Sequence, residues 1–410
     1  MADIKPFRAI RPRADMVDQI AALPYDVYSR KEAYEKVRGD VCSFLRIDRP
    51  ETQFPEEHDM YAYEVYEKAA SMLQEMQSSG LLLQEETEAY YIYELVMNGH
   101  SQVGIGACVS VDDYERQVVK KHENTRAEKE TDRIRHIDHC NAQTGPILLA
   151  YRRRERIEQV VREVMQTSPI YDFTAEDGVR HMGWKLSDAK KMQKLMEAFE
   201  EVECLYIADG HHRAASAVKV GQMRREAYPD YNGTEEFNYF LSVLFPDDEL
   251  MIMDYNRVVK DLNGYSIEEF LGRVSEKFEI RLLKRPEKPS KKGQITMYLQ
   301  GYWFRLKVQE EYIQKDPVEG LDVAYLQREL LEPILGIKDP RTDKRVDFVG
   351  GIRGLEELKK RADSDMMVAF AMYPTSIEEL LAVADAGRLM PPKSTWFEPK
   401  LRSGLFIHEI

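Results

Sequence analysis

The segment that most constrains the fold is Cys204–Ala217, where an apolar run gives way to a glycine turn and then to small residues with helical spacing. The apolar run is rich in strand-forming residues, and the turn falls at Asp209-Gly210. The pattern therefore predicts a strand, a tight turn and a helix. The first turn of that helix would carry three basic side chains, His211, His212 and Arg213.

This turn has two interpretations. The first N–H groups of a helix have no partner within it and lie at the positive end of its dipole, so they can bind an anion. In that interpretation the phosphates of a nucleotide would be bound by Gly210, His211, His212 and Arg213. In the other interpretation Asp209 is the N-cap of an ordinary helix, and the basic side chains after it are solvated.

The charge and the cysteines exclude several classes of protein. The formal net charge is −14 over 410 residues, which argues against non-specific binding to nucleic acid, because neutralising phosphates needs a basic face. The four cysteines lie far apart without a C-x-x-C pair, so buried thiols are expected rather than disulfides or a zinc site. No apolar run approaches the length of a membrane span, and the N-terminus lacks an apolar signal core. We therefore expect a soluble cytoplasmic protein with a small-molecule substrate, and we leave a homodimer open.

Local patterns predict a mixed α/β fold. Ser29 and Glu32 form a capping box for a short helix, and Asn98-Gly99 predicts a hairpin between strands 90–97 and 102–111. The segment Ser43–Pro50 resembles a strand that carries two arginines. Strands 237–245 and 250–253 are expected to form a hairpin around Pro246–Asp248.

A change of composition near residues 261–264 suggests a domain boundary. We expect an α/β domain over residues 1–262 and a second module over residues 263–410, in which helices and strands alternate as in an α/β fold. The proline-rich segment 390–410 reads as a rigid extended arm that returns to the site and places Lys393 and Lys400 at specific positions. A solvated tail fixed by Trp396 and Phe397 is the alternative.

Six motifs, in order along nearly the whole chain, resemble those of the domain-of-unknown-function 1015 family. They are Pro6–Ala9, Leu23–Val27, Ser43–Ile47, His122–Thr125 with Asp132-Arg133, Ala208–Arg213 and Met390–Thr395. One position departs from the family pattern, because Asn256 stands where a histidine is expected before Arg257.

The central turn is also similar to the phosphate-binding turn of the ParB and sulfiredoxin-like fold, which includes free-serine kinases. This resemblance implies a nucleotide-binding core with a mixed sheet. Sulfiredoxins carry a catalytic cysteine directly after the turn glycine, where this chain has His211, so sulfinic acid reduction is not expected. DNA clamping of the ParB kind is not expected either, given the acidic charge.

The resemblance leaves a nucleotide-dependent phosphotransferase that uses ATP or ADP with Mg²⁺. Its acceptor would be a small metabolite with a hydroxyl group, and the kinase branch suggests free L-serine, which would give O-phosphoserine. The alternative is a regulatory protein that binds or hydrolyses a nucleotide and has no phosphate acceptor.

Phosphoryl transfer depends on positioning and on charge neutralisation, which suggests roles for individual residues. The catalytic candidates are Glu123 as the first choice of base, Asp209 as the second, and His212. The candidates for gripping the substrate are Arg46, Arg133 and Lys393. No metal-ligand set is predicted, because His136 and His139 lack a reliable third ligand.

Overall fold

The computed structural model describes all 410 residues, Met1–Ile410, and the chain forms two compact units. Unit 1 comprises Met1–Lys121, Thr125–Leu250 and Pro399–Ile410, and unit 2 comprises His122–Asn124 and Met251–Glu398. The boundary expected at residue 262 therefore lies within unit 2. The reason is that strand β14 (Tyr255–Val259), which precedes residue 262, pairs with β18 (Val346–Gly350) and β19 (Val368–Ala371).

Unit 1 contains a nine-stranded mixed sheet, which confirms the predicted mixed α/β class. The β6–β11 and β8–β12 pairs are parallel and the other pairs are antiparallel. Strand β1 (Ile4–Lys5) pairs with β5 beside the main path. The main path runs in the order β6 (Val119–Lys120), β11 (Leu205–Asp209), β8 (Ile147–Tyr151), β12 (Tyr239–Pro246), β5 (His100–Ser110), β4 (Tyr90–Met97), β10 (Arg180–Leu186) and β9 (Tyr171–Thr174).

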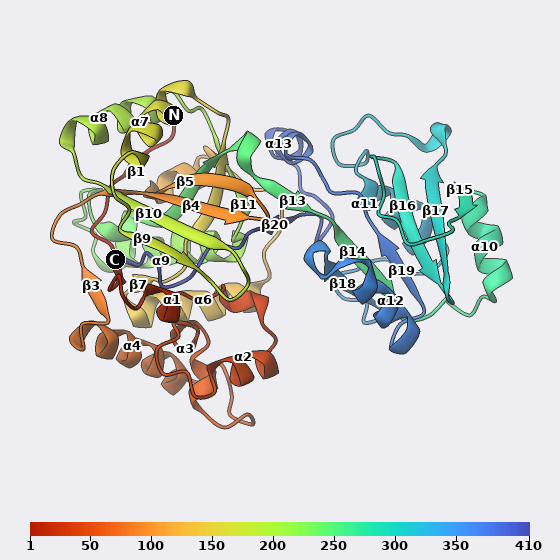
Figure 1. Ribbon diagram of the computed structural model, residues 1–410, viewed down its shortest axis with the longest axis horizontal. Helices are drawn as coiled ribbons and strands as arrows, with labels where there is room; N and C mark the ends of the chain where they lie inside the picture. Colours follow the sequence, from red (N-terminus) through yellow and green to blue (C-terminus); the bar gives the residue numbers. More distant parts are fainter. The chain divides into compact units, whose positions relative to one another are not determined.

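Helices cover this sheet on both sides. In Figure 1, α7 (Glu155–Met165) and α8 (Ala189–Phe199) lie together above the sheet, and α6 (Ala127–Cys140) lies below it next to α4 (Tyr63–Ser78). Helix α9 (His211–Ala227) follows β11 directly and packs against α6 and β12. Its buried alanines and valines join the apolar core under the sheet.

The elements with strong local signals form as predicted. The Asn98-Gly99 turn has φ of 51° and 81°, the left-handed pair that a two-residue hairpin needs, and it joins β4 to β5. Helix α2 (Arg30–Val37) begins at Ser29 with the full capping box to Glu32.

The strand predicted over Ser43–Pro50 is wrong. This segment forms the short helix α3 (Leu45–Asp48) followed by a 3₁₀ turn over Pro50–Gln53. The Asp40 carboxylate accepts hydrogen bonds from the backbone N–H groups of Cys42 and Ser43, both at 3.0 Å, which turns the chain before the helix. The apolar side chains then pack onto α4 rather than into a sheet.

The hairpin predicted around Pro246–Asp248 is also wrong. A 3₁₀ turn over Asp247–Glu249 follows β12, and the Glu249 carboxylate accepts a hydrogen bond from the Val103 N–H at 2.7 Å. The turn is therefore tied to β5. The next strand, β13 (Met251–Met253), pairs with β20 (Trp396–Glu398) instead of β12.

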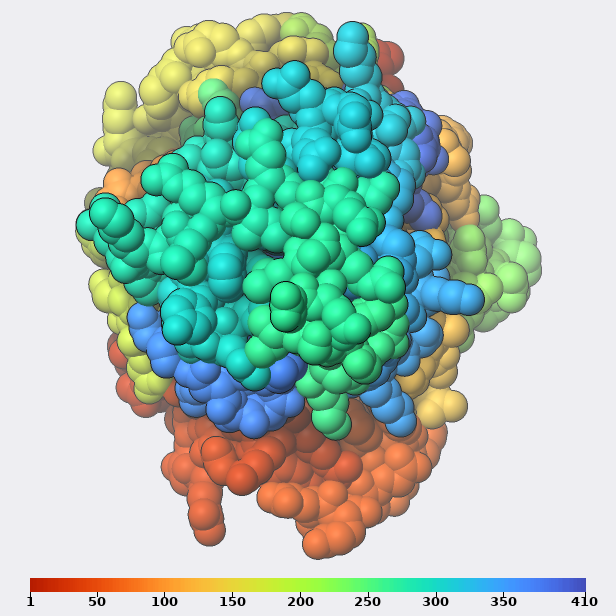
Figure 2. Space-filling view, turned by 90° about the vertical axis from the view of Figure 1, so that its right-hand side faces the viewer, coloured from red at the N-terminus to blue at the C-terminus, as the bar shows by residue number.

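Unit 2 is built on a six-stranded sheet in which every neighbouring pair is antiparallel, although its helices and strands alternate along the chain as expected. The order is β15 (Phe278–Leu282), β17 (Tyr302–Val308), β16 (Gln294–Leu299), β19, β14 and β18. The helices are α10 (Ile267–Ser275), α11 (Asp322–Leu326), α12 (Gly354–Ser364) and α13 (Ile377–Asp385). Figure 2 shows that stretches coloured green, teal and blue together form the face that carries α10.

None of the helices in either unit combines the length and the apolar composition that crossing a bilayer requires.

We expect Gly104→Ala to destabilise unit 1 by about 1–3 kcal/mol, because an added Cβ in β5 would lie 2.6 Å from Val243 Cγ1 and 2.7 Å from Phe245 Cζ. Gly272→Ala is the matched control. Nothing lies within 4 Å of its added Cβ in α10, so it should stabilise unit 2 by about 0.5–1 kcal/mol. Denaturant unfolding of both variants measures the two effects, and equal shifts would contradict the packing argument.

Candidate functional site

The site begins at the turn between β11 and α9. Gly210 is the N-cap of α9 and has φ of +96°, a left-handed conformation that favours glycine. Asp209 ends β11, so the alternative in which Asp209 caps the helix is wrong. Because glycine has no side chain, this helix start lacks the usual side-chain cap.

The Asp209 carboxylate forms ion pairs with two cations instead. Its Oδ2 lies 3.4 Å from Arg213 Nη2 and 3.4 Å from Lys400 Nζ. Burial acts to raise the pKa of Asp209, but Lys400, Arg213 and His211 outweigh it and hold the pKa far below its usual range. Asp209 is therefore ionised at neutral pH and is a weak proton acceptor. Asp209 therefore links the end of β11 to Arg213 on α9 and to Lys400 in the C-terminal segment.

The Arg213 side chain folds back over the turn. Its Nη1 donates a hydrogen bond to the Pro146 carbonyl. A Cβ added at Gly210 would lie 3.0 Å from Arg213 Nε, so glycine is required both by the φ angle and by the position of this guanidinium.

The two histidines after the glycine have different surroundings. His211 is buried, whereas His212 is partly exposed. The His212 Nε2 accepts a hydrogen bond from the Arg126 N–H at 3.0 Å, so this nitrogen carries no proton. The structure therefore places the His212 imidazole against the N-cap residue of α6.

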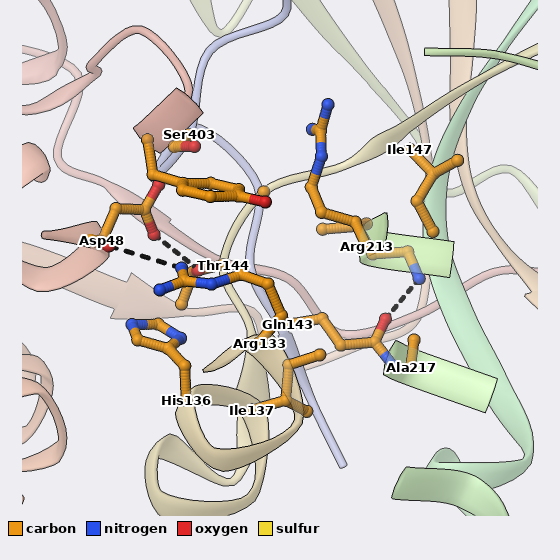
Figure 3. A pocket seen from close by; sticks show the side chains of 13 residues that line it. Asp48, Arg133, His136, Ile137, Gln143, Thr144, Ile147, Arg213, Ala217 and Ser403 are labelled. Atoms are coloured by element: carbon orange, nitrogen blue, oxygen red, sulfur yellow. Dashed lines mark hydrogen bonds between the residues drawn. The ribbon is translucent and has the colours of Figure 1, made fainter. Parts of the chain in front are cut away.

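A cavity of about 30 Å³ lies beside the turn (Figure 3). Its polar lining comes from separate elements of unit 1, namely Tyr25, Asp48, Arg133, His136, Thr144, Arg213 and Ser403. This volume holds about two water molecules, which is too little for a nucleotide. Arg213 therefore belongs both to the turn and to the cavity wall.

Arg133 is held in place by several groups at once. Its Nε donates to Asp132 Oδ2 at 2.9 Å, its Nη1 donates to the Asp48 carbonyl at 3.3 Å, and its guanidinium lies 4.2 Å from the Tyr25 ring centroid. Burial acts to lower the pKa of Arg133, but Asp132, Tyr25 and Asp48 outweigh it and raise the pKa, so the side chain stays charged.

Asp48 and His136 complete this wall (Figure 3). The buried Asp48 carboxylate accepts a hydrogen bond from Thr144 Oγ1 at 2.7 Å. His136 Nε2 lies 2.8 Å from the Ile47 carbonyl, so Nε2 carries the proton of the imidazole. Burial, together with the nearby Arg133 charge, lowers the pKa of His136 to about 4.

The structure brings some of the predicted residues together. Gly210, His211, Arg213 and Asp209 share the turn, and Arg133 shares the cavity with Arg213. Arg46 lies outside the cavity lining, since its guanidinium is bound to Gln53 Oε1 and the Val41 carbonyl. Two further predicted residues, Glu123 and Lys393, belong to unit 2.

The sequence predicted that the arm places Lys400 at a specific position, but not that its partner is Asp209. It did not point to Asp48, Thr144 or Ser403. Asp48 lies two residues after the predicted Arg46, on α3. The Gly404 N–H, next to Ser403, donates a hydrogen bond to the Thr144 carbonyl at 3.0 Å. A signal for Ser403 was present in its apolar neighbours Leu401, Leu405, Phe406 and Ile407, which are unusual for an exposed tail.

The structure shows no group of three His, Cys, Asp or Glu side chains placed to hold a metal ion. The Mg²⁺ expected with a nucleotide would need only one or two carboxylates beside the phosphate oxygens. The carboxylate nearest the turn, Asp209, already pairs with Arg213 and Lys400.

The protein has a mixed α/β fold. A strand of its large sheet, β11, is followed by a glycine turn and by helix α9, whose first turn carries basic side chains. The chain belongs to the family described as "Protein of unknown function (DUF1015)", whose model matches residues 4–324. The resemblance stated from the six sequence motifs is thereby confirmed. A search of curated proteins found no match.

Solved structures with similar folds share low sequence identity with this chain. A free serine kinase variant in complex with AMP has a TM-score of 0.35 at 14% identity, covering 71% of this chain and 87% of its own. SbnI from Staphylococcus aureus, truncated at its C-terminus, has a TM-score of 0.38 at 11% identity, covering 72% and 82%. A conserved hypothetical protein from Pyrococcus furiosus has a TM-score of 0.35 at 15% identity, covering 73% and 93%.

We expect His136 to make the stability of unit 1 depend on pH. The unfolded chain binds a proton at this histidine near pH 6.5, but the folded chain binds it only near pH 4. Stability is therefore fully present above pH 6.5 and falls by about 3 kcal/mol as the pH drops to 4. Unfolding of His136→Gln, measured across this range, should show a shallower pH dependence than the natural chain.

The control is His139→Gln on the same helix, where the imidazole contact with the Arg135 carbonyl is exposed. This variant should keep the pH dependence of the natural chain. Identical pH profiles for the natural chain and His136→Gln would contradict the prediction.

Proposed function

We propose that this protein binds the phosphates of a nucleotide at the start of α9 and transfers a phosphoryl group to a small hydroxyl metabolite. The observation that carries the proposal is the helix start at Gly210, which has no side-chain cap and stands beside Arg213 and Lys400. The positive end of the helix dipole and the nearby Arg213 guanidinium favour an anion at this position.

The finer form of the proposal is a nucleotide-binding core of the ParB and sulfiredoxin-like kind, with ATP or ADP as donor and free L-serine as acceptor. Arg133, which lines the cavity with Arg213, is the candidate to grip the carboxylate of the acceptor, and the cavity would have to widen to admit it. Arg213 supports this arrangement, because it touches both the turn and the cavity.

Each residue of the turn has a distinct part in the proposal. Gly210 lets a phosphate approach the main chain, and Arg213 offers the planar fork that suits phosphate oxygens. Asp209 positions Arg213 and Lys400 by its two ion pairs, since its low pKa makes it a poor base. The role of general base then falls to Glu123, and a bound nucleotide supplies the phosphoryl group.

The second candidate is a regulatory protein that binds or hydrolyses a nucleotide without an acceptor. It is favoured by one observation, namely that the carboxylate beside the turn, Asp209, is held ionised by two cations and does not take up a proton at neutral pH. A protein that only binds a nucleotide needs no general base beside the turn.

We expect Arg213→Met to weaken the binding of ATP and of ADP by about tenfold or more, because charge-assisted hydrogen bonds to phosphate are lost. Isothermal titration calorimetry measures this effect. The control is Arg224→Met in the last turn of α9, where the arginine pairs with Asp138 at 2.9 Å and affinity should stay within about twofold. If Arg213 merely supports the helix, Arg213→Met lowers stability by about 1 kcal/mol and leaves nucleotide affinity unchanged.

We expect O-phosphoserine from L-serine with ATP or ADP, and Glu123→Gln should lower its rate of formation by about 100-fold or more while nucleotide affinity is kept. Asp209→Asn should weaken nucleotide binding, because Arg213 and Lys400 lose the ion pairs that position them, whereas a role of Asp209 as base would lower turnover at unchanged affinity. Phosphorus NMR follows the product. Nucleotide binding without transfer to any amino acid or sugar alcohol would favour the regulatory protein.

A further inference from the structure

Unit 2 contains a buried arginine without an acidic partner. Arg257 on β14 is only 3% exposed, and no carboxylate lies within ion-pair distance of its guanidinium. Its hydrogen bonds go to two backbone carbonyls, those of Tyr255 and Pro392, the latter at 3.2 Å. Burial lowers the pKa of Arg257 to about 10, so the side chain is still charged at neutral pH. A buried charge without a counter-ion is costly.

The nearest acidic side chain on the same stretch is already neutralised. Asp254 pairs with Lys288 Nζ at 2.9 Å and accepts a hydrogen bond from Asn256 Nδ2 at 2.6 Å. The Asn256 Oδ1 in turn accepts one from the Met372 N–H at 2.8 Å. The residue that departs from the family pattern therefore completes this closed network, and the charge of Arg257 stays outside it.

The Pro392 carbonyl belongs to a loop, Pro391–Thr395, that is fixed from several directions. Ser394 Oγ donates to the Pro391 carbonyl at 2.6 Å, and Thr375 Oγ1 donates to the Ser394 carbonyl at 3.0 Å. Lys393 within this loop has φ of +58°, a left-handed conformation that costs free energy in a residue other than glycine. The loop thus holds one lysine in a strained and defined position.

Lys393 and Arg257 meet at one aromatic residue. The Lys393 ammonium lies 5.6 Å from the Tyr255 ring centroid, and the Tyr255 carbonyl accepts a hydrogen bond from Arg257. The Trp396 ring packs edge-on against Tyr255 with centroids 5.0 Å apart, which fixes the ring. Two cations therefore lie next to Tyr255 of β14, and one of them, Arg257, has no acid to balance its charge.

We propose that Arg257, Lys393 and the main chain of the Pro391–Thr395 loop form a binding site for a small oxyanion, a phosphate group, built from residues of unit 2. A phosphate oxygen would supply the negative charge that Arg257 lacks. The strained backbone at Lys393 would then position the ammonium, and the hydrogen bond to the Pro392 carbonyl would position the Arg257 guanidinium, before the anion binds. The proposal does not depend on the glycine turn of unit 1.

The test uses the full-length Arg213→Met chain, so that loss of the turn does not affect the outcome. Hydrogen exchange by mass spectrometry follows the amides of residues 393–397 with sodium phosphate, with ADP, and with sodium chloride of equal ionic strength. Protection by phosphate identifies the free anion, and protection by ADP alone identifies a phosphate group of a larger ligand. Protection by neither overturns the proposal.

Two variants localise the effect. Lys393→Ala removes an exposed side chain, and Arg257→Met removes the buried charge. Each should raise the phosphate concentration needed for half-maximal protection about tenfold. Arg257→Lys, which keeps the charge, should recover part of the affinity. The controls are Arg273→Met on α10, an exposed arginine over the Tyr265 ring at 4.4 Å, and Lys291→Ala, and neither should change it.

A purely structural role for Arg257 makes a different prediction. Arg257→Met would then speed exchange of the loop without any anion, and the loop of the Lys393→Ala chain would respond to phosphate as the parent chain does. That result overturns the proposal while leaving nucleotide binding at Gly210 untouched, because the two sites are assayed in different variants.

Discussion

The pairing of the Asp209 carboxylate with Arg213 and Lys400 is the interaction on which the site depends. It joins the end of β11, the first turn of α9 and the C-terminal segment at a single side chain. The same pairing helps to fix where the Arg213 guanidinium lies, 3.0 Å from the position of a Cβ added at Gly210. One ionised group therefore links the turn to the wall of the cavity, which Arg213 also lines.

Positive charge is concentrated at two places in an otherwise acidic chain. The net charge of −14 describes the whole sequence, whereas the start of α9 carries Arg213 beside the positive end of the helix dipole, and unit 2 buries Arg257 without an acidic partner. Because charges are screened over about 8–10 Å at physiological salt, the acidic remainder does not cancel these local fields. A chain that avoids nucleic acid can therefore still be suited to small phosphate-bearing molecules.

Sequence predicted those parts of the fold that are decided by neighbouring residues. The Asn98-Gly99 hairpin, the Ser29 capping box and the strand, turn and helix around Gly210 each follow from a few consecutive side chains. The strand expected over Ser43–Pro50 failed because packing on α4 decided its conformation. The strand expected over residues 250–253 forms as β13, but its hairpin with β12 does not, because the partner of β13 is β20, far along the chain. Within the site, Arg213 and Arg133 were predictable from their motifs. The arm that carries Lys400 was predicted as well, but its partner Asp209 was not, because 191 residues separate the two in the sequence.

The division of the chain between the units has a consequence for synthesis. The sequence of unit 1 is interrupted after Leu250 and continues at Pro399, so the main part of unit 2 is an insertion within unit 1. During synthesis the turn between β11 and α9 is made long before Lys400 and Ser403, because nearly all of unit 2 lies between them in the sequence. The Asp209 carboxylate therefore acquires Lys400 only after 191 further residues have been added. A protein cut short before this lysine would contain every strand of the large sheet and would lack one of the two cations that pair with Asp209.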